Sequence, residues 1–122
     1  MATVVDIMKG GTSAGQAQAI NGQVNPSITA AGTTISDATD LTASINVITT
    51  AAASTGVQLP SGMVGDQVEI LNLGANSVTV YPDATANRIN QLTAGSGFSL
   101  AINTAVKLRK FSSTRWMAWL SA

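Results

Sequence analysis

Residues 67–82 read QVEILNLGANSVTVYP, and this stretch decides the fold class. Apolar and polar side chains alternate on both sides of a turn-forming segment, residues 74–77, as they do in half-buried strands. Val78 and Val80 are expected to face a core, since side chains two apart share one face of a strand. Pro82 ends the second run because proline cannot donate a ladder hydrogen bond. The stretch therefore predicts two strands joined as a β-hairpin.

The flanking sequence carries more runs of this kind, separated by turn residues at intervals of roughly ten residues. Further strands are predicted at residues 45–50, 55–60, 97–102, 105–111 and 115–120. The spacing of Leu41, Ile45 and Ile48 also fits a short helix, but the β-branched residues in this run favour a strand. The predicted fold is all-β, a small antiparallel sandwich or barrel-like domain with an extended N-terminal arm.

Two segments of different composition divide the chain. Residues 1–43 are rich in Gly, Ala, Ser, Thr, Gln and Asn and hold few large apolar side chains, whereas the predicted strands lie in residues 44–122. We therefore predict an N-terminal arm and polar segment over 1–43 and a β domain over 44–122. A chain of 122 residues has the length of one ordinary domain.

One short apolar run stands out near the N-terminus. It holds the β-branched residues Val4, Val5 and Ile7 and is followed directly by Gly10 and Gly11. A β-branched run of this kind can add a strand to the exposed sheet edge of a partner. We predict that these three residues form a contact arm and that the two glycines form a flexible joint. The same residues fit the first strand of the domain equally well.

The composition favours association with other proteins. Charged residues make up 10% of the chain and six acidic residues balance six basic ones, so long-range repulsion between copies is weak. Aromatic residues make up only 4%, and much of the apolar share is alanine, which buries little area. We expect self-association to supply burial that one chain lacks. The chain lacks the excess of basic residues that is typical of nucleic-acid-binding proteins. It also contains no apolar run long enough to span a membrane.

The residue inventory points away from enzymatic chemistry. The chain has no histidine and no cysteine, so it lacks the side chains of the common catalytic triads and zinc sites. Asp66 and Glu69 are three apart at the start of a predicted strand and therefore diverge. Asp37 and Asp40 fit a polar turn or cap better than a calcium loop. We expect no catalytic residues, no metal and no cofactor.

Basic residues gather near the C-terminus, at Lys107, Arg109, Lys110 and Arg115. Lys107 and Arg109 share one face of a predicted strand, so we predict that they face an acidic surface of a partner. A charged outer face that discourages edge-to-edge aggregation is the simpler interpretation.

Two tryptophans are predicted to lie on opposite faces of the last strand. One of them, Trp116 or Trp119, can fill the core, and the other then lies at an interface or in solvent. We predict Trp119 as partner-facing. Stacking of a sugar on an exposed tryptophan, with Tyr81 as a second platform, is the alternative.

A family resemblance rests on several short strings of residues 44–120. They are TGVQLP at 55–60, GDQVEILNLG at 65–74, VTVYP at 78–82, Ile89 with Asn90, and a terminal strand with Trp116. Together they resemble a β-module of small tailed-phage virion proteins, found in head decoration (cement) proteins, head fibres and tail appendages.

The resemblance implies a function for the whole chain. It looks like a free-standing decoration protein, a homotrimer that binds the major capsid protein where three capsid subunits meet. The implied location is the exterior of the phage head, after synthesis in the host cytoplasm, since the N-terminus lacks the pattern of a signal peptide. The alternative function is a receptor- or glycan-binding module of a head fibre or tail appendage.

Overall fold

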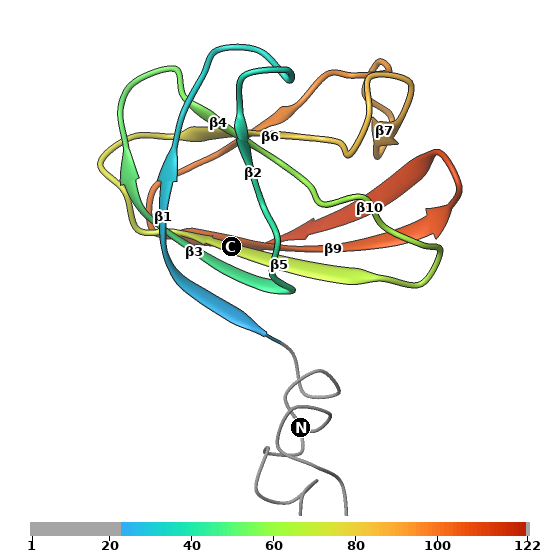
Figure 1. Ribbon diagram of the computed structural model, residues 1–122, viewed down its shortest axis with the longest axis horizontal. Helices are drawn as coiled ribbons and strands as arrows, with labels where there is room; N and C mark the ends of the chain where they lie inside the picture. The colour runs from blue at the N-terminus through green and yellow to red at the C-terminus, as the bar shows by residue number, and fades with distance from the viewer. Residues whose placement is uncertain (1–22, 122) are drawn as a thin grey trace, which may run out of the picture.

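Two β-sheets face each other in the computed structural model of this chain, which describes residues 23–121 (Figure 1). The large sheet has the strand order β1-β3-β5-β9-β10-β7, and the small sheet has the order β2-β4-β6-β8. The strands of the large sheet are β1 (Val24–Ala30), β3 (Ile45–Ala51), β5 (Gln67–Asn72), β7 (Arg88–Ile89), β9 (Thr104–Ser112) and β10 (Arg115–Leu120). Those of the small sheet are β2 (Thr39–Asp40), β4 (Gly56–Gln58), β6 (Val78–Tyr81) and β8 (Phe98–Leu100). None of the described residues forms a helix that could cross a membrane.

The first six strands wind between the two sheets as in a solenoid. β1, β3 and β5 are parallel neighbours in the large sheet, and β2, β4 and β6 are parallel neighbours in the small one. The winding then ends, because β8 and β9 add antiparallel to β6 and β5, and β10 returns along β9. The all-β prediction is confirmed for residues 23–121, but the sheets are mixed rather than antiparallel.

The predicted hairpin at residues 67–82 is wrong, because its two strands belong to different sheets. The segment between them forms a corner. The Asn72 amide donates to the carbonyl oxygens of Asn76 and Leu100, both at 3.0 Å, and its oxygen accepts from the Gly74 N–H at 2.9 Å. A Cβ on Gly74 would lie 2.7 Å from the Ala51 Cβ, so the chain passes too close to β3 for a larger residue. Each strand therefore pairs with one from an earlier winding.

Alternating side chains of both sheets form the core. Val78 and Val80 of β6 are buried as predicted, and Trp116 of β10 fills the space between the layers with no exposed surface. Residues 45–51 form a strand rather than the alternative helix. The core residues are Ile28, Ala30, Leu41, Ile48, Ala51, Val57, Leu59, Val68, Ile70, Val78, Val80, Ile89, Leu100, Val106, Leu108 and Trp116.

Part of the predicted polar segment belongs to the packed unit. β1 pairs with β3 from Val24 to Ala30, and β2 pairs with β4. The two sheets therefore begin N-terminal to the boundary that the composition predicted at residue 43. Outside the described residues lie the predicted arm and its joint, Val4, Val5, Ile7, Gly10 and Gly11.

Candidate docking face

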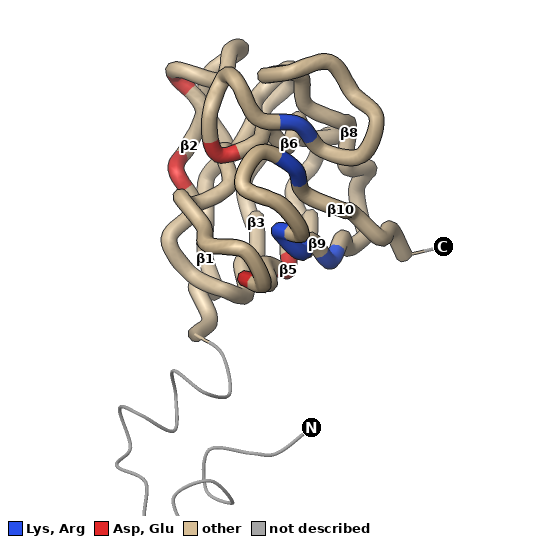
Figure 2. Tube along the Cα trace, turned by 90° about the vertical axis from the view of Figure 1, so that its right-hand side faces the viewer, with Lys and Arg blue, Asp and Glu red and all other residues tan. Residues whose placement is uncertain are grey.

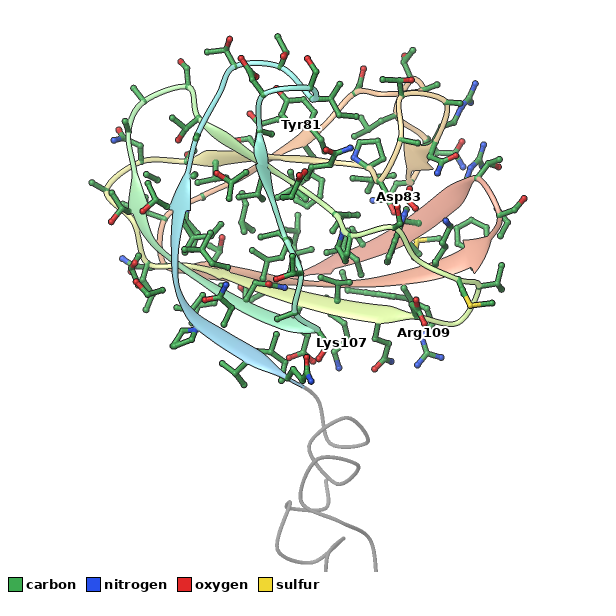
Figure 3. The ribbon with its side chains drawn as sticks, in the orientation of Figure 1. Tyr81, Asp83, Lys107 and Arg109 are labelled. Carbon is green, nitrogen blue, oxygen red and sulfur yellow. The ribbon has the colours of Figure 1, made fainter. Side chains whose placement is uncertain are left out.

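The large sheet turns one face toward the small sheet and the other away from it (Figures 1 and 3). We call the second one the outer face. It consists of the outward side chains of β3, β5, β9 and β10, which alternate with the core residues of those strands. Its members include Ile45, Val47, Gln67, Glu69, Leu71, Ala105, Lys107, Arg109, Phe111, Met117 and Trp119. Among residues 23–121, no further layer packs on this face.

A row of four residues crosses the centre of the outer face. The strand register pairs Ile45 with Glu69, Glu69 with Lys107, and Lys107 with Trp119. The Lys107 Nζ lies 3.6 Å from the Glu69 Oε1, and the two side chains are 53% and 39% exposed. The row therefore presents an apolar side chain, an acid, a base and an apolar side chain in that order.

Two shorter rows flank the central one. On one side Gln67 pairs with Arg109, and Arg109 pairs with Met117. The Gln67 carboxamide oxygen accepts from the Arg109 Nε at 3.2 Å when the amide is turned toward the guanidinium. On the other side Leu71 pairs with Ala105. The outer face is thus an apolar surface crossed by one ion pair and one polar pair.

The structure brings the three residues predicted to face a partner onto this one surface. Lys107 and Arg109 point away from the core on β9 (Figure 3), while Val106 and Leu108 between and beside them are buried. Trp119 is 54% exposed on β10, as expected for the tryptophan opposite Trp116. In Figure 2 the basic positions gather around β9 and β10, and most acidic positions lie toward β1 and β2. Contact with a partner at these residues stays a prediction.

The edges of both sheets are poorly suited to strand addition. β2 and β7 are two residues long, and β8 is three. β1 contains Pro26, and its register with β3 shifts twice. Short strands, proline and irregular register are the features by which proteins protect sheet edges from pairing with other chains. A partner of the described domain therefore binds a face of a sheet more readily than it adds a strand to a sheet edge.

A buried ion pair, which was not predicted from the sequence, ties the two sheets together. The Lys110 Nζ on β9 lies 2.7 Å from the Asp83 Oδ2, just after β6, and both side chains are less than a tenth exposed. Lys110 also donates to the Gly62 carbonyl oxygen at 2.8 Å. The Asp83 Oδ1 accepts from the Asn87 Nδ2 at 2.6 Å and from the Trp116 Nε1 at 3.0 Å. Lys110 is therefore not part of the charged outer face.

A signal for this ion pair was present in the alternation of β9. Val106, Leu108 and Lys110 are two apart, so the strand that buries the first two also buries the lysine. A buried lysine needs an acidic partner, because an unpaired charge in a core is very costly. The sequence does not indicate which acid it is, because Asp83 is 27 residues away.

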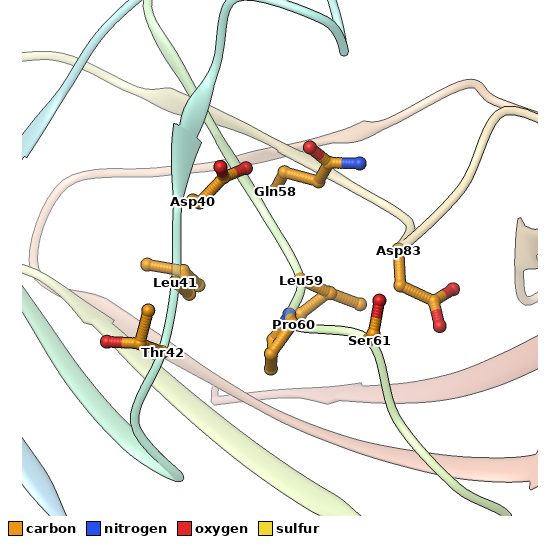
Figure 4. A pocket seen from close by; sticks show the side chains of 8 residues that line it. All are labelled: Asp40, Leu41, Thr42, Gln58, Leu59, Pro60, Ser61 and Asp83. Atoms are coloured by element: carbon orange, nitrogen blue, oxygen red, sulfur yellow. The ribbon is translucent and has the colours of Figure 1, made fainter.

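The same ion pair bears on chemistry in the neighbouring pocket. Asp40 and Asp83 lie on opposite sides of a pocket of about 440 Å³ between the strands (Figure 4). Burial raises the pKa of Asp83, but hydrogen bonds from Lys110, Asn87 and Trp116 outweigh it, so the pKa lies below its usual value of 3.8. A carboxyl that acts as a general acid needs a raised pKa. Asp83 is therefore unsuited to donate a proton in this pocket.

Comparisons of the chain with models of protein families, with curated proteins and with solved structures found no match.

Proposed function

We propose that this chain is a virion structural protein, a capsid decoration (cement) protein that binds across capsid subunits on the exterior of a phage head and stabilises it. The observation that carries the proposal is the outer face. It places Trp119, Met117 and Ile45 around a single ion pair, with no other part of residues 23–121 packed on it. Exposed apolar side chains gathered on one face, with polar groups among them, are typical of protein interaction sites. The resemblance of residues 44–120 to decoration proteins supplies the kind of partner.

The mechanism is preferential binding to one state of the shell. A clamp that bridges neighbouring capsid subunits buries surface only while the shell is closed, so it stabilises the closed state by mass action. An oligomer strengthens the effect, because several weak contacts act at high effective concentration. The resemblance implies a homotrimer, although the mechanism requires only more than one copy.

In this proposal, two parts of the chain make the contacts with other proteins. Val4, Val5 and Ile7 form the arm that reaches the major capsid protein, and Gly10 with Gly11 lets the arm reorient as it docks. The outer face buries its apolar side chains against protein in the assembled particle. No nucleic acid, membrane, metal or cofactor takes part, and the chain performs no catalysis.

Deletion of residues 2–9 tests the arm. The deletion leaves every strand of the described domain in place, so the variant should fold and self-associate like the full chain. It should fail to cosediment with expanded phage heads that retain the full-length protein. Cosedimentation equal to that of the full chain would show that the arm makes no contact. A chain that cosediments with no tailed-phage head, in either form, would contradict the decoration function itself.

A second function is favoured by the surroundings of Trp119. This side chain borders a shallow pocket of about 320 Å³ together with Glu69, Lys107 and Ser121. An exposed indole beside a carboxylate and a hydroxyl can bind a sugar ring by stacking and hydrogen bonding. Tyr81 adds little, because it lies on the small sheet and its hydroxyl donates to the Thr33 carbonyl oxygen at 3.1 Å. A glycan array with wild-type protein and a Trp119→Ala variant separates this function from the first.

A further inference from the structure

The outer face has a property that follows from its strand register. β5 and β9 are antiparallel, and their outward residues pair directly: Gln67 with Arg109, Glu69 with Lys107, and Leu71 with Ala105. Each pair joins groups that attract or pack, namely an amide with a guanidinium, an acid with a base, and two apolar side chains. Two antiparallel strands with such pairs form a surface that is complementary to itself.

The complementarity appears when a second copy is placed face to face on the first. A two-fold axis in the interface, parallel to the strands and midway between β5 and β9, lays β5 of one copy on β9 of the other. Glu69 then meets Lys107 of the partner subunit, and Gln67 meets Arg109 of the partner subunit. One strand further out, Ile45 of β3 meets Trp119 of the partner subunit.

The charges distinguish this axis from a second two-fold arrangement of the same faces. An axis in the interface that runs across the strands, along the central row, would lay each residue of that row on its own copy. Glu69 would meet Glu69 and Lys107 would meet Lys107. Like charges placed opposite one another in an interface are strongly unfavourable. Of these two axes, the ion pair favours the one parallel to the strands.

We propose that the partner of the outer face is a second copy of this chain, packed about the two-fold axis between β5 and β9. The contact is isologous, so each favourable pair occurs twice. This inference rests on the proposed function in one respect, namely that the outer face is buried by protein. It identifies that protein as a second copy of the chain. It also departs from the trimer that the resemblance implies, because an isologous contact closes with two copies.

Charge reversal with mixing tests the arrangement. Glu69→Lys and Lys107→Glu are made separately in the full-length chain, and the mass of each protein is measured by light scattering over a range of concentrations. Each single variant places like charges together twice. The dissociation constant for self-association should rise by at least about a hundredfold. Each like-charge contact costs more free energy than a tenfold change in dissociation constant represents, and there are two such contacts. The Glu69–Lys107 pair is exposed, so each variant should keep its fold, checked by thermal unfolding.

The mixture of the two variants gives the decisive result. One variant then carries two bases at the centre of its outer face and the other carries two acids, so every central contact between unlike copies is favourable. We expect a two-copy species with one chain of each kind in native mass spectrometry, and we expect the double variant Glu69→Lys with Lys107→Glu to self-associate again. A wild-type mass of one or three copies, or a mixture that stays monomeric, would overturn the arrangement. Binding to phage heads is measured separately, so loss of the decoration function leaves this result standing.

Discussion

Replacing Asp83 with asparagine tests whether the buried ion pair holds the two sheets together. The substitution keeps the shape of the side chain and removes its charge. It leaves the Lys110 ammonium, 7% exposed, without the carboxylate that it contacts at 2.7 Å. It also weakens the acceptor for the Trp116 indole N–H, which bonds the same carboxylate at 3.0 Å. Lys110 keeps its bond to the Gly62 carbonyl oxygen and its position over the Trp116 ring, 5.8 Å from the ring centre.

Removal of one partner from a buried ion pair costs about 3–5 kcal/mol. The bond to Gly62 places Asp83→Asn toward the lower end, about 3 kcal/mol. For a domain of this size the unfolding midpoint should then fall by about 12 °C or more. Asp40→Asn is the matched control, because the Asp40 side chain is exposed on β2 and forms no hydrogen bond or ion pair within residues 23–121. Its effect should stay within about 0.5 kcal/mol.

The assay is urea unfolding of wild type and both variants at one chain concentration, since self-association adds to apparent stability. A double variant, Asp83→Asn with Lys110→Met, should be more stable than Asp83→Asn alone, because it removes the unpaired ammonium. A loss below about 1 kcal/mol for Asp83→Asn would place the pair among ordinary surface contacts. That result would refute the view that it joins the sheets.

Three further predictions concern single residues. The pKa of Asp83 is lowered in the folded protein, so the ionised carboxylate stabilises the fold at neutral pH, and this contribution should be lost as the pH falls below 3.8. In urea unfolding at a series of pH values, the stability of Asp83→Asn should therefore fall less steeply with acid than that of wild type. Equal falls in stability for the two proteins would contradict the assignment. Gly97→Ala should destabilise the fold by about 1–3 kcal/mol, since a Cβ there lies 2.6 Å from the Val80 carbonyl oxygen; an unchanged urea midpoint would show that β8 can shift. Trp116→Ala should lower the free energy of unfolding by about 3–5 kcal/mol in thermal unfolding. Trp119→Ala should change the stability of the monomer by no more than about 0.5 kcal/mol but weaken the self-association measured by light scattering. Equal losses of stability in the two variants would place both side chains in the core.

Alternation along single strands predicted which way side chains point. Val78 and Val80 are buried, Lys107 and Arg109 face outward, and the two tryptophans lie on opposite faces of β10. These predictions needed no knowledge of neighbouring strands, because the two-residue period of a strand is a local property. The turn predicted at residues 112–114 joins β9 and β10 as a hairpin, and this turn is also a local feature of the sequence.

The choice of partner strands could not be predicted in this way. A turn signal at residues 74–77 is compatible both with a hairpin and with a corner that leads into the other sheet. The corner occurs because Asn72 bonds the chain around it and β3 already lies beside β5. The pair of Lys110 with Asp83 has the same non-local origin. The candidate docking face follows from both kinds of information, since alternation supplies its residues and register supplies their order.

Oxidative footprinting of the full-length chain, from dilute to concentrated solution, tests most directly whether the outer face is buried by protein. Met117 and Trp119 are 38% and 54% exposed on the single chain, and Met63, in the loop before β5, is 79% exposed. The two outer-face side chains should lose reactivity as concentration rises, while Met63 stays reactive. If Met117 and Trp119 are oxidised as fast in concentrated as in dilute protein, the outer face does not mediate self-association.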